Sequence, residues 1–453
     1  MTKNKKTQEH INSLTDFRQQ VCALFENQHD ALFEIMDAVI QTSAARSYAE
    51  LSLAPAFSRK WPSLYSALAD GSIDVFGLHS LCLSQVPQTQ EWLHFAIDVM
   101  AVRRMNSPTL KDRVFCHGAK REVSGTGIII GLPYSILAYI DRRGASWAPS
   151  VHTQRVEPSQ SAVEVAVAQA RWLAEQLANT NFTIAFDGSY GNLKFFRLIL
   201  GVRAFVTARM RNDRLLYLIP EAPPEGEKKP GRPPKYGPEF RFADPATWPT
   251  PDEVLEFEDA KHGRVRLEMW LDLRFRTKKD EIVDIPAVVR SQIHLERDKP
   301  PAPHWYGVHN GTTEETALAR VYESITHRWP IEPANRFRKE RLYAELPKVR
   351  RAEASDLWLN LLQVIEWELY LWRPAASDAY LPWQKPLAPE QLTPGRVIRS
   401  LSENLERVGT PVSPVLPRGK SPGWPSGRVR TAPPTYKLES KKRKKALDMS
   451  KNE

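Results

Sequence analysis

Two short apolar segments of similar pattern constrain the fold of this chain more than any other feature. LHFAIDV spans residues 93–99 and NFTIAFDGSYG spans residues 181–191, and each brings an aspartate after a run of apolar residues. Such runs, rich in β-branched and aromatic residues, are typical of buried strands. Because strand side chains alternate between faces, Asp98 and Asp187 each share a face with an alanine two positions earlier. We therefore expect two strands that each carry a carboxylate at the carboxyl end, where α/β sheets place their ligands.

The neighbouring segments predict a mixed α/β fold around these two strands. YSILAYID (134–141) and WAPSVHTQRV (147–156) read as further strands, and a stretch rich in Ala, Val and Gln over 161–178 reads as a helix. LKFFRLIL, directly after the second aspartate segment, predicts another helix. Three strands, a helix, a strand and a helix is the element order of a ribonuclease H-like α/β sheet. We expect such a core over residues 91–203 and 326–408.

The flanking regions differ in composition and in the secondary structure that they predict. Residues 1–90 predict an all-helical N-terminal region, which would contact DNA ends or a second subunit, or serve only as a packing platform. Residues 204–325 contain strand-like runs around the segment PPEGEKKPGRPPKYGPE and predict a β-rich insertion. Residues 409–453 are rich in Pro, Gly, Lys and Arg, and this composition predicts a disordered basic tail.

Size and composition set broader limits. A chain of 453 residues is too long for one ordinary core, and its formal charge of +10 favours a polyanionic partner, although weakly. The three cysteines form no CxxC pair, and Cys116-His117 has no second pair at ligand spacing, so we expect reduced thiols and no zinc site. An apolar span of membrane length and a signal-peptide core are both missing, which predicts a cytoplasmic, nucleoid-associated protein.

A third acidic position lies in THRWPIEPANRFRKERLY. Arg336 and Lys339 follow Glu332 at steps of four and seven, which place all three on one face of a helix. Pro333 suits a first helical turn, so Glu332 would lie at the start of that helix. By spacing alone, a solvated helix with paired charges explains the pattern equally well. Likewise, Asp98 and Asp187 alone read as ordinary helix-cap or turn aspartates, as the sequence Asp-Gly-Ser at 187–189 suggests.

Taken together, these segments resemble the DDE transposases of bacterial insertion sequences, in the subgroup with a Tyr-x2-Arg-x3-Glu-x6-Lys signature. Arg328-x3-Glu332-x6-Lys339 matches that signature, whereas Ile325 stands where the subgroup has tyrosine. AIDVMAVRR around Asp98 and IAFDGSYG around Asp187 look like the first and second aspartate motifs of the group. GRPPKYGPEFRFADPATWP (231–249) resembles a segment of one bacterial branch of these proteins, which also carry a β-stranded insertion.

The resemblance implies a ribonuclease H-like fold, two Mg²⁺ ions for which Mn²⁺ substitutes, and cut-and-paste transposition. Asp98, Asp187 and Glu332 would be the catalytic carboxylates and metal ligands, with Asp98 shared by both ions. Two such ions activate the attacking oxygen and stabilise the leaving one. Water would attack at the element end, followed by the freed 3′-hydroxyl. The implied partners are double-stranded DNA, as element ends and target, and a second copy of the chain in the DNA complex.

Several basic and aromatic residues are candidate DNA contacts. Arg328, Arg336 and Lys339 would grip phosphates near the scissile bond. Lys228 to Lys235 resemble an AT-hook core, in which Arg232 would enter a narrow minor groove beside Lys235, although a basic surface loop would read the same way. Trp305 and Trp329 would stack a flipped base, or are core residues. The basic run 441–445 would tether phosphates, or only solubilise the chain.

Two further functions stay open from the sequence. A catalytically inactive descendant would keep the fold and bind DNA, and Ile325 keeps that reading open. A ribonuclease H-like nuclease would cut DNA without joining the ends to a target.

Overall fold

The structure is a computed structural model that describes residues 2–118, 127–141, 146–220, 234–277, 281–310, 317–415, 423, 426–429 and 431–439. The chain divides into two compact units. Unit 1 comprises Met1–Pro87, Val99–Ser161 and Pro330–Glu453, and unit 2 comprises Gln88–Asp98 and Ala162–Trp329. The strand that carries Asp98 contributes to both units.

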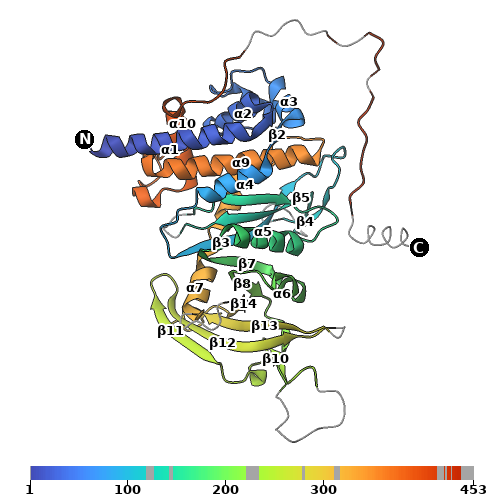
Figure 1. The fold of residues 1–453 in the computed structure, drawn as a ribbon, viewed down its shortest axis with the longest axis vertical. Coiled ribbons are helices and arrows are strands. Elements are labelled where there is room, and N and C mark those ends of the chain that lie inside the picture. Colours follow the sequence, from blue (N-terminus) through green and yellow to red (C-terminus); the bar gives the residue numbers. More distant parts are fainter. Residues whose placement is uncertain are drawn as a thin grey trace, which may run out of the picture. The chain divides into compact units, whose positions relative to one another are not determined.

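Unit 1 is mainly helical at both chain ends. Its helices are α1 (Thr2–Leu24), α2 (His29–Gln41), α3 (Pro62–Asp70), α4 (Val75–Ser84), α8 (Ile331–Glu340), α9 (Ala352–Trp372) and α10 (Pro394–Val408), with short 3-10 turns η1 (Tyr48–Leu53), η3 (Arg373–Ala375) and η4 (Pro389–Gln391). The N-terminal part of this unit also contains a minimal antiparallel pair, β1 (Phe25–Asn27) with β2 (Ser72–Ile73). Helix α9 is buried on most of its faces, with α1 alongside it (Figure 1), and its buried residues include the charged Glu366 and Glu368.

A buried charge cluster joins α1 to its neighbours. The Arg18 guanidinium on α1 donates to Asp37 on α2 at 2.8 Å and to Glu368 on α9 at 3.0 Å. Because Arg18 is 1% exposed, these carboxylates compensate a charge that burial would otherwise make costly.

Unit 1 also contains β4 (Val114–His117), β5 (Ile128–Tyr139) and β6 (Ser150–Arg155), with β5 antiparallel to both β4 and β6. Helix α9 packs on β6, where the Trp367 indole donates to the Ser150 carbonyl at 2.8 Å and Glu366 accepts from the Ser150 amide at 2.8 Å. The predicted strands at 134–141 and 147–156 are therefore present as β5 and β6, and helix α9 packs against β6.

Unit 2 is a mixed sheet with helices. Its elements are the first part of β3 (Trp92–Arg103), α5 (Ala162–Gln176), β7 (Asn181–Gly191), α6 (Leu193–Ile199), β8 (Phe205–Met210), β9 (Leu215–Leu218), β10 (Glu239–Arg241), η2 (Pro245–Thr247), β11 (Glu253–Asp259), β12 (Gly263–Phe275), β13 (Val283–Gln292), β14 (His304–His309) and α7 (Ala317–His327). Strands β3, β7 and β8 are parallel, and from β8 the sheet continues antiparallel through β14, β13 and β12 (Figure 1).

Two expectations about this region need correction. Strand β8 was expected in the insertion, but it pairs in parallel with β7 and so extends the core sheet. The last part of the expected insertion is helix α7, whose apolar side packs on β8, β12 and β13 through Leu318 and Val321. Both corrections follow from tertiary pairing, which a single strand-like run of sequence does not reveal.

The tail is not disordered throughout. The backbone amide of Tyr436 donates to the Pro108 carbonyl at 2.8 Å, and that of Glu439 donates to the Arg113 carbonyl at 3.0 Å. The Arg113 guanidinium in turn donates to the Tyr436 carbonyl at 3.1 Å. The prediction of disorder from residue 409 onward does not hold for this segment, because main-chain hydrogen bonds hold it although most of its side chains are exposed.

Candidate active site

The two aspartates of the sequence motifs occupy equivalent positions on adjacent parallel strands. Strands β3 and β7 pair in register from Trp92 opposite Asn181 to Ile97 opposite Phe186, and Asp98 and Asp187 are the next residues. In-register side chains of neighbouring parallel strands point to the same face, and such strands lie about 4.8 Å apart. The register therefore places the two half-buried carboxylates one strand spacing apart, on one face of the sheet.

The expectation that each aspartate ends its strand is wrong. Strand β3 continues to Arg103 and β7 continues to Gly191. What ends at the aspartates is the regular pairing, since the β7–β8 register also shifts between Phe186 and Gly191. The regular hydrogen-bond pairing between strands is thus interrupted at the two carboxylates. This interruption leaves space beside them, as the end of a strand would.

Asp187 combines a turn role with an outward-facing oxygen. Its Oδ1 accepts the Ser189 backbone N–H at close range, as in an ordinary aspartate turn. Its Oδ2 lies 3.8 Å from Nη2 of Arg328, and the two side chains are 38% and 17% exposed. A Cβ built on Gly188 would meet no atom within 4 Å, so the space beside the carboxylate is open. The turn reading and a site role are therefore compatible, one for each oxygen.

A polar layer that sequence reasoning missed underlies these carboxylates. His94 and Thr183 form a register pair four residues before the two aspartates, and His94 Nδ1 lies 2.9 Å from Thr183 Oγ1. His94 is 1% exposed, and its ring centroid is 5.0 Å from that of His327, the last residue of α7. One strand further on, Thr207 Oγ1 lies 2.7 Å from Ser324 Oγ.

These contacts fix the carboxyl end of α7 over the face that carries the aspartates, so that Arg328, the next residue, reaches Asp187. The sequence did contain a signal. His94 and Thr183 are polar residues inside apolar strands, at the same face parity as the acids.

The predicted acidic helix exists, and it lies in unit 1. Glu332 is exposed in the first turn of α8, with Arg336 exposed and Lys339 half-buried further along the helix. Between them, Arg338 is 2% exposed and ion-pairs with Glu366, so it anchors the helix instead of facing outward. The predicted helix start at Glu332 is thus confirmed.

The structure shows metal-ligand candidates and not an assembled metal centre. Among the residues that it describes, no group of three or more His, Cys, Asp or Glu side chains is arranged to hold a metal ion. Asp98 and Asp187 nevertheless supply carboxylate oxygens, which are the hard ligands that Mg²⁺ prefers. The register-matched pair therefore fits as two of the expected ligands.

The aromatic candidates differ from one another. Trp305 is 1% exposed and stacks on Phe242 at a centroid distance of 4.2 Å, so the expected base-stacking role must be corrected to a core role. Trp329 is 55% exposed, with Lys261 Nζ 5.6 Å from its ring centroid. Ile325, at the position expected to hold tyrosine, packs against the apolar core beneath α7.

The AT-hook candidates are only partly visible. Arg232 and the run 441–445 lie outside the described residues. Lys235 is described, and its ammonium donates to Thr277 Oγ1 at 3.2 Å and lies 5.5 Å from the Tyr236 ring centroid. Lys235 is therefore engaged within unit 2 rather than projecting as part of a free loop.

An α/β sheet with two register-matched carboxylates and an arginine beside one of them defines a candidate site for metal-dependent phosphate chemistry. The sequence profile of the DDE superfamily endonuclease family matches residues 20–272, and the chain belongs to this family. The matched span includes Asp98 and Asp187 and ends before Glu332.

Among solved structures, the chain is similar to one described as "Cryo-EM structure of piggyBac transposase synaptic complex with hairpin DNA". The two share 10% sequence identity at a TM-score of 0.40, over 88% of this chain and 79% of that chain. No curated protein matches the chain. Within the described part of the chain, no helix is both long and apolar enough to span a membrane.

Proposed function

We propose that this endonuclease-family protein is a DDE transposase that cleaves DNA at the ends of an insertion sequence and joins those ends to a target. The observation that carries the proposal is the equal register of Asp98 and Asp187 on adjacent parallel strands. The order β3, β5, β6, α5, β7, α6 also agrees with the order expected of a ribonuclease H-like core, with β4 as an additional strand.

In this proposal Asp98, Asp187 and Glu332 hold two Mg²⁺ ions, with Asp98 shared. Bound metal would supply an activated attacking oxygen and stabilise the leaving oxygen. The protein's own contribution is to hold the carboxylates on a rigid sheet and to offset their mutual repulsion. Arg328 serves that second purpose at Asp187, where its guanidinium lies within ion-pair distance.

Glu332 is the least constrained of the three acids. It follows Arg328 by four residues, so chain geometry keeps the two Cα atoms within about 14 Å of each other. The spacing Arg328-x3-Glu332-x6-Lys339 is what supports Glu332 as the third ligand.

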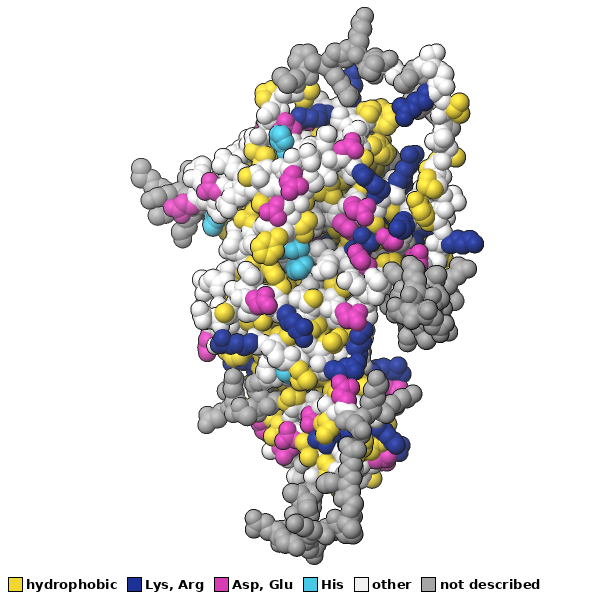
Figure 2. All heavy atoms as spheres, turned by 45° about the vertical axis from the view of Figure 1, so that its right-hand side comes forward, with side chains coloured by type: hydrophobic (Ala, Val, Ile, Leu, Met, Phe, Trp, Pro, Cys, Tyr) yellow, Lys and Arg dark blue, Asp and Glu magenta, His cyan; other side chains and the backbone are white. Residues whose placement is uncertain are grey.

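The DNA-facing residues in this proposal are Arg328, Arg336, Lys339, Trp329, Arg232 and Lys235. Arg336 and Trp329 are exposed, as a phosphate contact and a base platform require. On the face drawn in Figure 2, Lys and Arg side chains alternate with Asp and Glu side chains, so net charge alone locates no DNA path. The DNA complex would contain two copies of the chain, one for each element end.

The test is incubation with the DNA that flanks the gene, with and without Mg²⁺, scoring nicking and joining separately. Asp98→Asn, Asp187→Asn and Glu332→Gln should each abolish both products while sparing DNA binding. Asp213→Asn is a matched control, since Asp213 is an exposed carboxylate of unit 2 that forms its ion pair with Arg211, two residues away. Glu332→Gln with wild-type cleavage would overturn the assignment of the third acid. Nicking without joining would instead identify a nuclease, and binding without nicking a non-catalytic descendant.

A further inference from the structure

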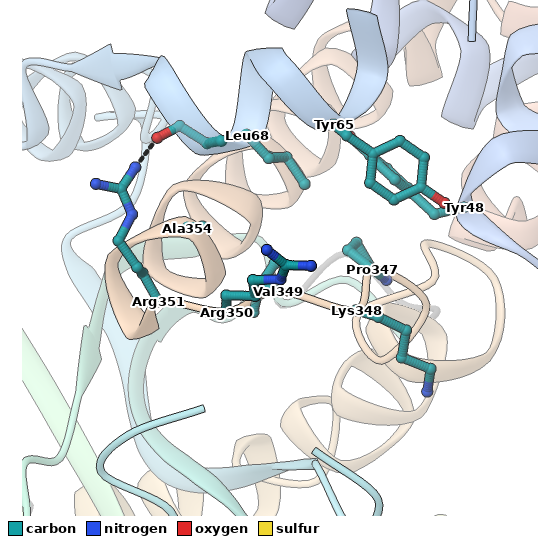
Figure 3. A pocket seen from close by; sticks show the side chains of 10 residues that line it. Tyr48, Tyr65, Leu68, Pro347, Lys348, Val349, Arg350, Arg351 and Ala354 are labelled. Carbon is teal, nitrogen blue, oxygen red and sulfur yellow. Dashed lines mark hydrogen bonds between the residues drawn. The ribbon is translucent and has the colours of Figure 1, made fainter. Parts of the chain in front are cut away.

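A cavity of about 370 Å³ lies in unit 1 and is lined by none of the residues assigned above. Tyr48, Tyr65 and Leu68 line one side, and the segment from Pro347 to Arg351, directly before α9, lines the other. Figure 3 shows the two tyrosine rings facing this segment across the opening. The cavity volume falls at the lower end of the range typical of small-ligand sites.

The cavity wall is positively charged. Lys348 and Arg350 are exposed, and among the residues that the structure describes neither has an ion-pair partner. Arg351 differs, because its guanidinium donates to the Ala69 carbonyl and so holds the segment to α3 (Figure 3). No acidic residue lines the cavity among these described residues. Glu345 and Glu353 flank the segment along the chain, and their carboxylates lie 3.4 Å from Arg103 and 3.8 Å from Arg155, respectively.

The opposite wall offers a braced aromatic face. Tyr65 is 40% exposed and meets Tyr48 edge to face at a centroid distance of 5.2 Å. Tyr48 is itself buried, with its hydroxyl donating to the Leu64 carbonyl at 3.1 Å and its ring 5.6 Å from that of Trp358. Trp61, 58% exposed, lies 6.0 Å from Tyr65 on the outer side. The exposed ring of Tyr65 is thus fixed in orientation by neighbours whose positions the core determines.

We propose that this cavity binds one nucleotide of a DNA strand, with its phosphate on Lys348 and Arg350 and its base on Tyr65. Two unpaired cations opposite an exposed aromatic ring complement a charged backbone and a flat base at once. An acidic peptide would satisfy the cations but has no flat group for Tyr65. The inference deepens the proposed function by adding a DNA contact in unit 1, and it rests on that function only for the choice of DNA as the nucleic acid.

The test measures binding of the full-length protein to fluorescein-labelled DNA in EDTA, so that cleavage plays no part. The probes are a single strand and the matching blunt duplex, each titrated over a range of salt concentrations. In the double variant Lys348→Ala/Arg350→Ala, the slope of log K against log salt for the single strand should become less steep. The expected change is about 0.7 for each phosphate contact that is lost. Tyr65→Ala should weaken single-strand binding about tenfold, whereas Tyr65→Phe should retain it.

The controls separate this proposal from the catalytic one. Arg407→Ala removes an exposed cation of unit 1 that contacts only Asn404 in the described chain, and it should leave the salt dependence unchanged. Unfolding temperatures equal to wild type would show that the variants fold. Unchanged affinity and salt slope in the double variant would overturn the cavity assignment, as would equal competition by poly-glutamate and by unlabelled DNA. Neither result bears on Asp98→Asn, whose cleavage assay alone tests the proposed activity.

Discussion

Asp98 and Asp187 stand at the same level of two adjacent parallel strands, each one residue beyond the last register pair, Ile97 opposite Phe186. Two carboxylates one strand spacing apart repel each other unless a cation lies between or beside them. Arg328 is such a cation for Asp187. In the proposed site the pair would bind a divalent metal, while Arg328 offsets part of the repulsion in the absence of metal, and both effects are measurable without DNA.

Asp98→Asn should remove most of the thermal stabilisation that Mg²⁺ gives to the wild-type protein. In EDTA the variant should unfold at the same temperature as wild type or slightly higher, because one member of the repelling pair is neutral. Thermal unfolding in EDTA and across a Mg²⁺ titration measures both effects. Asp213→Asn serves as the control and should behave as wild type. If Mg²⁺ raised the unfolding temperature of Asp98→Asn as much as that of wild type, Asp98 would not be a metal ligand.

Arg328→Ala should weaken DNA binding and reduce its dependence on salt, since one phosphate contact is lost. In EDTA it should also lower stability by at most about 1 kcal/mol, because the ion pair with Asp187 is partly exposed. Arg328→Lys keeps the charge and should recover part of both effects. Filter-binding titrations at several salt concentrations and urea unfolding provide the measurements. Binding that is as strong and as salt-dependent as wild type would contradict a phosphate role.

Trp305→Ala and Trp329→Ala should differ in their effects on stability and DNA binding, because Trp305 is a core residue and Trp329 is a surface residue. Trp305 lies in an aromatic cluster with Phe242, Trp248 and Trp270, so its truncation should cost about 3–5 kcal/mol of unfolding free energy. Trp329 is exposed, and its truncation should leave stability within about 0.5 kcal/mol while reducing affinity for DNA with an unpaired base. Denaturant unfolding and DNA titration of both variants test the contrast. Equal stability of the two would be inconsistent with it.

A histidine pair should make unit 1 sensitive to acid. His79 on α4 stacks on His152 on β6 at a centroid distance of 3.9 Å. Burial lowers the pKa of His152 to about 4 and lowers the pKa of His79 well below its usual value, to which the neighbouring His152 also contributes. Because unfolded histidine titrates near pH 6.5, the unfolded chain takes up protons first as the pH falls from about 6.5 to 4. The stability that the two neutral histidines contribute is therefore fully present above that pH window and is lost as the pH falls through it.

For His152 alone the loss across the window is on the order of 3 kcal/mol. Glu368 contributes with the opposite sign, since burial raises the pKa of its carboxyl to about 7 and its folded form takes up the proton first. The informative quantity is thus the difference in unfolding free energy between wild type and His152→Gln, measured by urea unfolding from pH 7.5 to 4.5. That difference should shrink as the pH falls, and a constant difference would exclude the pair as an acid-sensitive element.

Much of the architecture was accessible from the sequence because it depends on local patterning. The buried helix α9 and the amphipathic helix starting near Glu332 follow from residue spacing, and so do the strands around Asp98 and Asp187. Their face alternation also predicted that each acid shares a side with a small residue. These features require only the chain's own periodicity, which is why their types were right while the strand ends were not.

The features that were missed all depend on partners distant in sequence. Trp305 looks like any aromatic beside a motif until Phe242 is seen stacked on it. Strand β8 resembles the strands of the insertion until its parallel pairing with β7 is known. The segment around Tyr436 has a composition typical of disorder, yet carbonyls at Pro108 and Arg113 hold its backbone. Composition and periodicity carry no information about such contacts.

The shared register of β3 and β7 also restricts how this chain can vary in evolution. Insertion or deletion of one residue between Trp92 and Asp98, or between Asn181 and Asp187, would turn the acid to the opposite face of the sheet. Loops that join the strands tolerate changes in length, but these two seven-residue stretches tolerate only substitutions. Relatives that retain the activity should therefore align without gaps across both stretches, however far the rest of their sequences has diverged.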